Sequence, residues 1–471
     1  MEQFTKIVTK IDDLVWGVPL IVLILTVGIF MTIRLRGLQI SKLPKALKYM
    51  VKNEDGGKGE VSSFGALCTA LSATIGTGNI VGVATAICAG GPGALFWMWV
   101  AALFGMATKY SEGVLAIKYR VIDKDNHALG GPFYYIENGM GVKWKWLAKL
   151  FAIFGIGAGL LGIGTITQVN GITTAVNNFF DGSNQWTVSL FGRDYSWTVV
   201  IAAIIVTVCV ALVVIGGIKR ISQVSQIIVP FMAGIYILFS VLLLVMNYKA
   251  IPQAFVEIFE SAFGIRAAAG GALGAIIVAM QKGIARGIFS NEAGLGSAPI
   301  AAAAAQTKEP VRQGLVSMTG TFIDTIVICT MTGLSIVLTG AHEQNLEGVA
   351  VTTYAFENGL PFGNQVCAFV LMLCLVFFAF TTILGWDYYS ERCLEYLIGG
   401  KKKALTVYRW LYIIAVFIGP FLTVAAVWTI ADIFNALMAL PNLVAILALS
   451  GVIVKETRSY FKRLQDGNIE E

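Results

Sequence analysis

Charged side chains are scarce in this chain of 471 residues. Only 13% of the residues are Asp, Glu, Lys or Arg, whereas 56% are hydrophobic and the mean hydropathy is +0.75. A soluble protein carries about 25% charged residues. The composition therefore excludes a soluble globular fold and predicts an integral membrane protein. We attribute its net charge of +6 to orientation in the membrane rather than to nucleic-acid binding.

Histidine and paired cysteines are also scarce. The two histidines, His127 and His342, fall in predicted loops, which excludes a histidine proton relay within the membrane. No cysteine pair lies in a predicted outer loop and no Cys-x-x-Cys motif is present, so we expect no disulfide framework, metal centre or cofactor. The first apolar run lacks a short core followed by a small-residue cleavage site. We therefore expect a retained helix rather than a signal peptide.

Apolar runs separated by polar loops predict eleven membrane spans and an all-α membrane protein. The spans cover residues 15–33, 64–89, 94–117, 148–175, 197–216, 224–246, 270–305, 313–339, 364–397, 405–427 and 432–454. With the amino terminus outside, 26 of the 34 Lys and Arg fall on the cytoplasmic side, five outside and three within spans. The positive-inside bias therefore predicts an outer amino terminus and a cytoplasmic carboxyl terminus in the cytoplasmic membrane.

Two of these spans contain residues that do not suit a continuous helix. The second is interrupted at 75–79 by Ile-Gly-Thr-Gly-Asn, and the seventh is interrupted at 286–294. Irregular backbone at bilayer depth is tolerated where it lines a cavity in the protein. Interrupted helices in matching places of two halves indicate the substrate site of a secondary transporter.

The positions of the breaks divide the chain into two repeats. Spans 2–6 and 7–11 form two sets of five, and an odd number places the second set upside down relative to the first. We therefore predict four parts: an extra amino-terminal helix with a basic linker (1–60), a first repeat (61–250), an inverted second repeat (251–454) and a cytoplasmic tail (455–471).

The first break offers charges of both signs to a ligand. The carbonyl end of the first half-helix is partially negative, and the N–H end of the second is partially positive. A zwitterionic amino acid matches both ends, with its carboxylate near Gly78 and its ammonium group, or a sodium ion, near Ser72 and Ile75. Asn79 can cap the second half-helix or contact the ligand. A glycine-rich packing interface is the alternative interpretation.

The second break is rich in charge and offers an aromatic wall. Lys282 and Arg286 are interpreted as gate charges that attract a carboxylate or pair with Asp324, and a purely structural ion pair is equally consistent with them. Phe289 can form a lid over a small substrate or can be a packing residue.

Span 9 and span 4 add polar side chains at the same depth. Thr381 and Thr382 are predicted sodium ligands, and bonding of each hydroxyl to its own helix is the alternative. Trp386 is predicted to bound the pocket from the inner side. Gln168 is a further pocket candidate, and Asp387 a gate or titrating group.

Several motifs resemble the alanine or glycine:cation symporter family. They are ATIGTGN at 73–79, GGPGALFWMWV at 90–100, FGMATKY at 104–110, GGP at 130–132 and FSNEAGLGSAP followed by IAAAAA at 289–305. The resemblance implies a LeuT-type fold of five plus five helices with one additional amino-terminal helix. It also implies sodium-coupled uptake of small neutral amino acids, above all alanine and glycine.

The resemblance also assigns roles to individual residues. It implies that Glu112 braces the unwound segments, and that sodium binds backbone carbonyls of the first broken helix together with hydroxyls of span 9. The implied sodium ligands are Ser72, Ile75, Thr381 and Thr382. Taken together with the residue-level reasoning above, the predicted substrate contacts are Ile75, Gly76, Thr77, Gly78, Asn79, Gln168, Phe289, Thr382 and Trp386. The predicted structural or gating residues are Glu112, Arg286, Asp324 and Asp387.

Two other functions are weighed against sodium symport. A proton-coupled carrier would use Glu112, Asp324 or Asp387 as its titrating group. An integral-membrane enzyme would need clustered Asp, His or Glu at the interface, which the chain lacks. The expected partners are the lipid bilayer, sodium and a small amino acid, and a monomer is the favoured oligomeric state.

Overall fold

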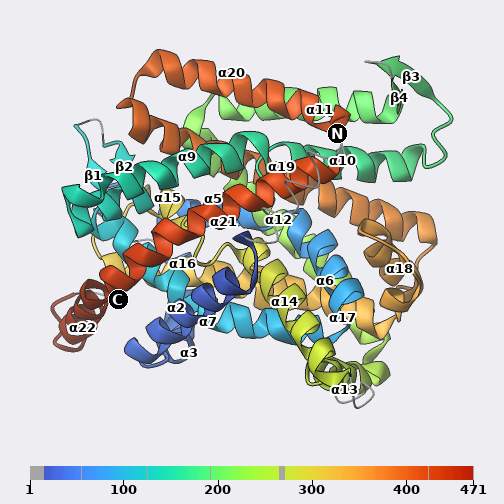
Figure 1. Cartoon of the computed structure of the whole chain (residues 1–471), viewed down its shortest axis with the longest axis horizontal. Coiled ribbons are helices and arrows are strands. Elements are labelled where there is room, and N and C mark those ends of the chain that lie inside the picture. Colours follow the sequence, from blue (N-terminus) through green and yellow to red (C-terminus); the bar gives the residue numbers. More distant parts are fainter. Residues whose placement is uncertain are drawn as a thin grey trace.

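The computed structural model describes residues 15–52, 54, 56–124, 126–190, 193–264, 271–422 and 424–469. The described chain is mostly helical, with short 3-10 or π segments denoted η (Figure 1). The predicted outer cations Lys6, Lys10 and Arg266 lie outside the described residues.

The described residues of the first half of the chain form fourteen helical segments and four strands. Its helical segments are α2 (Val18–Arg34), α3 (Leu38–Ser41), α4 (Leu43–Val51), α5 (Ser63–Thr74), η1 (Gly78–Gly82), α6 (Val83–Gly90), α7 (Gly93–Lys118), α8 (Pro132–Tyr134), η2 (Tyr135–Met140), η3 (Val142–Trp144), α9 (Lys145–Leu161), α10 (Ile166–Phe180), α11 (Trp197–Val214) and α12 (Gly217–Met246). The strands form two antiparallel hairpins, β1 (Val121–Ile122) with β2 (Ala128–Leu129) and β3 (Thr187–Leu190) with β4 (Arg193–Ser196).

The second half is wholly helical where it is described. Its segments are η4 (Tyr248–Ala250), α13 (Ile251–Ala262), α14 (Ala272–Asn291), α15 (Ala298–Ala302), α16 (Pro310–Thr321), η5 (Phe322–Cys329), α17 (Thr330–Leu338), η6 (Ala341–Glu343), α18 (Val349–Gly359), α19 (Asn364–Ile398), α20 (Lys402–Ile418), η7 (Gly419–Phe421), α21 (Val424–Ala448) and α22 (Ser450–Gln465).

Many of these helices are long and apolar enough to cross a membrane. Among the described residues there are seven such helices, or up to nine if each of two bent pairs is one span. The two other predicted spans coincide with α2, a shorter apolar helix of 17 residues, and with α7. The fold class is therefore a multi-pass helical membrane protein, while the count of eleven stays a prediction.

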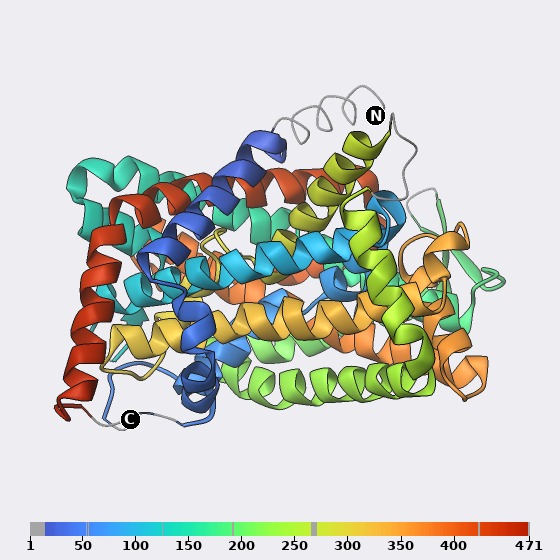
Figure 2. The ribbon, with the colours of Figure 1, turned by 90° about the horizontal axis from the view of Figure 1, so that it is seen from below.

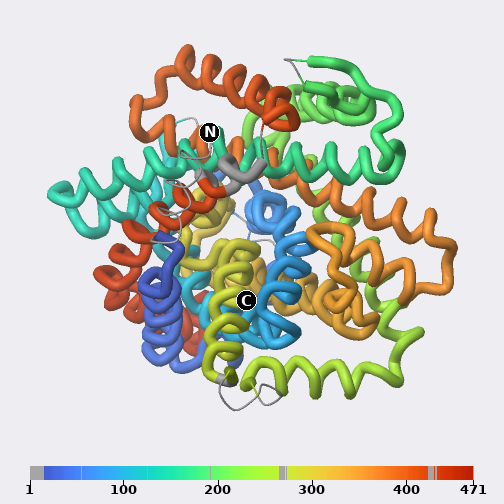
Figure 3. Tube along the Cα trace, turned by 45° about the vertical axis from the view of Figure 1, so that its right-hand side comes forward, coloured from blue at the N-terminus to red at the C-terminus, as the bar shows by residue number. Residues whose placement is uncertain are grey.

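The helices pack in two groups around the broken segments. Helix α7 packs against α14 and α16, and α19 packs against α9 and α10. Figure 1 shows α11 and α20 along one edge and α13 at the opposite edge, with the broken helices between them. In Figure 3, α6 and α14 lie side by side in the middle of the molecule.

The first predicted break is confirmed. Helix α5 ends at Thr74, and the chain resumes as the π-helical η1 at Gly78, so that the two halves of the span meet at 54°. Ile75 leaves the helix in an extended conformation (ψ 95°). Paired glycines beside Asn79 disfavour a continuous helix here, because glycine adds backbone freedom and Asn competes for backbone hydrogen bonds.

The second break begins later than the sequence predicted. Helix α14 runs through Arg286 and Phe289 to Asn291, so the prediction of a break starting at Arg286 is wrong. The irregular segment starts at Glu292 (φ +55°) and continues through two glycines with φ of +92° and +82°, Gly294 and Gly296. A single glycine within a helix costs only about 1 kcal/mol, so Gly287 does not end it.

Candidate functional site

The first break is a closed, buried turn. The side-chain oxygen of Asn79 accepts a hydrogen bond of 2.9 Å from the backbone N–H of Gly76. Ile75, Thr77 and Asn79 are all at most 2% exposed. The hydroxyl of Thr77 is buried and has no hydrogen-bond partner, which makes it an available polar contact for a ligand.

Helix α19 meets the carbonyl end of this break at Thr382. Its hydroxyl donates to the carbonyl of Ile75 (3.3 Å) and to that of Phe378 in its own helix (2.9 Å). A side-chain carbon added at Gly76 would lie 2.5 Å from Oγ1 of Thr382, so only glycine allows this approach. The structure therefore brings together two of the predicted sodium ligands, Ile75 and Thr382.

The other two predicted sodium ligands are turned toward their own helices. Thr381 donates to the carbonyls of Phe377 and Phe378, and its oxygen lies 3.5 Å from the sulfur of Met232 on α12. Ser72 donates to the carbonyl of Thr69 at 2.8 Å. Donation of the proton leaves the oxygen lone pairs available to a cation, so these contacts are compatible with the predicted role.

Gln168 lies at the first break, as predicted. Its side-chain oxygen accepts from the backbone N–H of Thr77 at 3.4 Å, and the residue is 2% exposed. The break is thus flanked by α10 on one side and by α19 on another, in agreement with the packing of α10 against α19.

Asp324 joins the two broken helices. Its Oδ1 accepts from Nδ2 of Asn79 at 2.7 Å, and its Oδ2 accepts from the hydroxyls of Ser290 and Thr325, each at 2.8 Å. The carboxylate is fully buried in the π-helical η5. Three uncharged donors therefore satisfy Asp324.

The predicted pairing of Arg286 with Asp324 is not observed among the described residues. The guanidinium of Arg286 instead lies over the ring of Phe289, 5.4 Å from its centroid. Arg286 lies four residues before Ser290 on α14 and so shares its face, but its guanidinium extends to the ring of Phe289 and lines the cavity that contains Asp432.

Phe289 separates a cavity from the first break. On one side its ring lies beside Gly78. A Cβ added to Gly78 would lie 3.5 Å from Cδ1 of Phe289. On the other side it lines a cavity of about 380 Å³ together with Lys282, Arg286 and Asp432. Phe289 thus lies between the first break and a cavity lined by Lys282 and Arg286, and the lid and gate roles of these residues stay predictions.

The second break is held by charged groups on α7. Oε1 of Glu112 accepts from the backbone N–H of Gly294 (3.2 Å) and from Asn442 (2.6 Å). Nζ of Lys109 donates to the carbonyl of Asn291, the last residue of α14, at 2.8 Å. Glu112 therefore contacts one of the two unwound segments, its predicted bracing role stays a prediction, and Lys109 lies at the carbonyl end of the helix before that segment.

Sequence reasoning missed the roles of Lys109, Glu292 and Asn442. Lys109 and Glu112 are three residues apart on one helix and therefore share a face, which was the available signal. Trp386 was expected to bound the pocket at the first break. Its indole N–H instead donates to Glu292 at 3.0 Å, so its polar contact is with the second break.

Among the described residues, no hydrogen bond joins the side chain of Asp387 to either break. Its Oδ1 is buried and lacks a hydrogen-bond partner among the described residues. One turn further along α19, Glu391 forms an ion pair with Arg409 of α20 at 2.8 Å between Oε1 and Nη2. Asp387 therefore sits beside a charged network at the end of α19.

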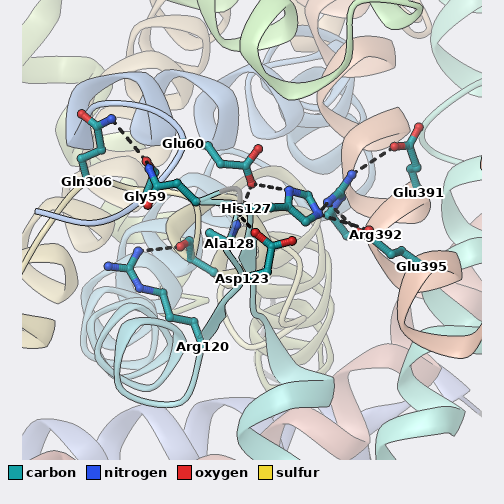
Figure 4. Close-up of polar contacts among 12 residues, drawn as sticks. Gly59, Glu60, Arg120, Asp123, His127, Ala128, Gln306, Glu391, Arg392 and Glu395 are labelled. Carbon is teal, nitrogen blue, oxygen red and sulfur yellow. Dashed lines mark hydrogen bonds and ion pairs between the residues drawn. The ribbon is translucent and has the colours of Figure 1, made fainter. Parts of the chain in front are cut away.

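This network reaches the β1–β2 hairpin (Figure 4). Nδ1 of His127 lies 3.1 Å from Glu60, and its Nε2 lies 3.1 Å from Glu395. Arg392 pairs with Glu395 at 2.6 Å and with Glu391 at 3.1 Å. The hydrogen bonds to Glu395 and Glu60 raise the pKa of His127 to about 9, against the opposing effects of burial and of Arg392.

The comparisons with known proteins identify the family of the chain. The family model described as the sodium:alanine symporter family matches residues 1–471. The chain belongs to this family.

Relatives align over nearly their whole length. An uncharacterised transporter of Haemophilus influenzae is 54% identical over 98% of this chain and 97% of its own. The sodium/alanine symporter AgcS of Methanococcus maripaludis is 47% identical over 97% of both chains. The probable sodium/glutamine symporter GlnT of Bacillus subtilis is 37% identical over 99% of this chain and 93% of its own. The chain thus aligns with these transporters over nearly their whole length, and the resemblance stated from its motifs is confirmed.

Proposed function

We propose that this protein carries small neutral amino acids, alanine and glycine, into the cytoplasm together with sodium by alternating access. The observation that carries the proposal is the contact between Thr382 and the carbonyl of Ile75 at the first break. It places a hydroxyl of α19 at the partially negative end of a half-helix, which is the oxygen-rich environment that a sodium ion prefers.

In this mechanism sodium binds between the first break and α19. The ion takes the carbonyl of Ile75 and the oxygens of Ser72, Thr381 and Thr382, and it draws α19 and the first break together. This fixes the turn of Gly76 and Asn79, and the N–H end of the second half-helix near Gly78 then receives the substrate carboxylate. Sodium and substrate raise each other's affinity by the same factor.

The proposed pocket is small. Thr382 and Gln168 pack closely against Gly76. A Cβ added to Gly76 would lie 3.3 Å from the side-chain oxygen of Gln168. Phe289 closes the pocket on the side of the cavity. A methylene group is discriminated by about 1–3 kcal/mol, so glycine and alanine should overlap, whereas larger side chains are excluded by volume.

The fold that we propose for this function is the LeuT-type arrangement with eleven spans. The broken helices α5–α6 and α14–α15 are the first helices of the two inverted repeats, and α2 is the additional peripheral helix. The distribution of Lys and Arg supports an outer amino terminus and a cytoplasmic carboxyl terminus in the cell membrane.

The test is uptake of labelled alanine by proteoliposomes under an inward sodium gradient, compared with an equal potassium gradient. We expect accumulation with sodium only, with competition by glycine but not by leucine or glutamine. Thr382→Ala should raise the half-saturating sodium concentration roughly tenfold, which corresponds to about 1.4 kcal/mol. Ser335→Ala is the matched control, because it removes a buried hydroxyl that bonds within its own helix.

Proton coupling is the second candidate, because three carboxylates are buried at the breaks. Asp324, Glu292 and Glu112 are at most 1% exposed. Uptake driven by an inward proton gradient in the absence of sodium would favour this candidate. Wild-type sodium dependence in Thr382→Ala would remove Thr382 from the proposed ion site.

A further inference from the structure

The carboxyl end of α2 and the start of α22 enclose a strongly basic hollow. A cavity of about 560 Å³ is lined there by seven residues, of which four are cations: Arg34, Arg36, Lys455 and Arg458. A second cavity of about 350 Å³ shares Arg36 and Arg458 with the first. It adds two further cations, Lys42 and Lys462, and neither lining includes an Asp or Glu.

The acidic residues of the neighbourhood are engaged elsewhere. Glu456 of α22 pairs with Lys118 at 2.7 Å, and Glu309 pairs with Arg463 at 2.7 Å. Arg34 donates to the uncharged hydroxyl of Ser450 at 2.6 Å. Within the described part of the chain, no carboxylate pairs with the four cations of the larger cavity. Like charges held together without a counter-ion repel one another, so the hollow favours an anionic ligand.

The helix α22 presents these cations on one face. Lys455, Arg458 and Lys462 follow a spacing of three and four residues and are exposed, whereas Ile453 and Tyr460 are buried against the core. The helix turns from α21 by 58°, which Figure 2 shows at one end of the molecule. This bend carries the basic face to the end of α2.

The hollow also lies where an apolar surface ends. Helix α2 is apolar from Val18 to Ile33 and ends at Arg34. Ile33, in the lining of the larger cavity, is 71% exposed. An apolar helix that ends in cations positions those cations at the depth of the lipid headgroups, with hydrocarbon beside the apolar part.

We propose that this hollow binds the phosphate headgroup of an anionic phospholipid. Arginine matches phosphate geometry with two parallel hydrogen bonds, and basic pockets between membrane helices bind anionic headgroups in this manner. The exposed Ile33 provides the surface for an acyl chain. Two adjoining cavities that share Arg36 and Arg458 suit a headgroup with two phosphates, so cardiolipin is the most sensitive probe.

Lipid binding at this place would link separate parts of the chain. The hollow lies between α2 and α22. Arg463 of α22 donates two hydrogen bonds, of 2.7 and 2.8 Å, to the carboxylate of Glu309 in the rest of the protein. A ligand that binds only the folded protein raises its thermal midpoint. The lipid should therefore stabilise the protein as well as bind to it.

The experiment uses the full chain purified in a neutral detergent and native mass spectrometry. Protein is incubated with cardiolipin, with phosphatidylglycerol, with phosphatidylcholine or with inorganic phosphate alone, and the lipid-bound fraction and thermal midpoint are measured. The test variant is Arg36→Gln with Lys455→Gln and Arg458→Gln. The matched control is Lys401→Gln with Lys402→Gln and Lys403→Gln, which removes three exposed cations from the amino-terminal end of α20. Arg458→Gln alone serves if the triple variant does not fold.

We expect wild type and control to bind cardiolipin and to be stabilised by it, with weaker binding of phosphatidylglycerol and none of phosphatidylcholine. The test variant should bind roughly 10- to 100-fold more weakly, since each Lys or Arg contributes about 1 kcal/mol near an anionic surface. Equal loss in the control would overturn the proposal, because it would show a general effect of charge. Binding of inorganic phosphate without the lipids would also overturn it, by identifying a free-anion site. Undiminished cardiolipin binding by the test variant would likewise overturn the proposal.

Discussion

The side-chain amide of Asn79 donates a hydrogen bond of 2.7 Å to Asp324, whose other carboxylate oxygen accepts from Ser290 at 2.8 Å. Asn79 belongs to the first broken span and Ser290 to the second. A single buried carboxylate therefore couples the two segments that line the proposed substrate site. A change in the position of one break is transmitted to the other through Asp324.

We expect Asp324→Asn to impair transport strongly. The amide group that replaces Oδ2 is a donor, so the hydroxyls of Ser290 and Thr325 lose their charged acceptor and must turn to accept instead. Such a loss costs about 1–3 kcal/mol, which corresponds to roughly 10- to 100-fold in coupling between the breaks. Alanine uptake per mole of reconstituted protein is the measurement. Asp181→Asn is the control, since Asp181 bonds Ser196 and not the breaks. Normal uptake by Asp324→Asn would show that the carboxylate is dispensable.

Gly76→Ala should disable the first break, whereas Gly82→Ala should not. An added Cβ at Gly76 would lie 2.5 Å from Oγ1 of Thr382, whereas nothing lies within 4 Å of the same atom at Gly82. Thr382 would have to rotate away and lose its contact with Ile75. Overpacking of this kind costs about 1–3 kcal/mol. We expect sodium-dependent uptake to fall at least roughly tenfold for Gly76→Ala only. Equal uptake by both variants would contradict the close packing proposed at Gly76.

The first break was predictable because its signal is local. Two glycines and an asparagine within four residues disfavour a helix whatever surrounds them, and the structure ends α5 at Thr74. The second break was predicted too early, because a cluster of charges was interpreted as irregular backbone. Arg286 and Gly287 remain helical, and the chain departs from the helix only where positive φ angles begin at Glu292.

The partners of the buried polar groups were less predictable. Thr381 and Thr382 are adjacent, and the sequence alone gives both the same sodium role. In a helix they differ by about 100°, so one contacts Ile75 while the other faces Met232. Lys109 binds a backbone carbonyl on another helix, a partner that has no sequence signature. Tertiary packing decides such contacts.

Lys109→Met should destabilise the protein far more than Lys118→Met, although both residues lie on α7. Lys109 is 3% exposed, and its removal leaves Glu112 and the carbonyl of Asn291 without their cation. Breaking a buried charged cluster in this way costs about 3–5 kcal/mol. Lys118 has a side chain that is 40% exposed and forms an ion pair with Glu456, a contact worth roughly 0–1 kcal/mol. Thermal midpoints in detergent provide the comparison, and similar midpoints for the two variants would argue against a structural role for Lys109.

The stability of the end that carries the β1–β2 hairpin should fall as the pH rises through about 9. Hydrogen bonds to Glu395 and Glu60 raise the pKa of His127 to about 9, against burial and the nearby cation of Arg392, which lower it. In the unfolded chain a histidine has a pKa of about 6.5. A group with a raised folded-state pKa contributes stability that is fully present below the unfolded pKa and is lost above the folded one.

The hydrogen bond to His127 also lowers the pKa of Glu60, although burial opposes it, so this carboxylate is ionised throughout the range above pH 6. Thermal midpoints between pH 6 and 10 should therefore decline between about pH 6.5 and 9 in the wild type and level off above that range. His127→Gln should remove that decline and resemble the high-pH wild type, because its neutral amide cannot carry the charge. Glu395→Gln removes the larger of the two stabilising partners and should shift the decline to lower pH. A decline that persists unchanged in His127→Gln would assign the titration to another group.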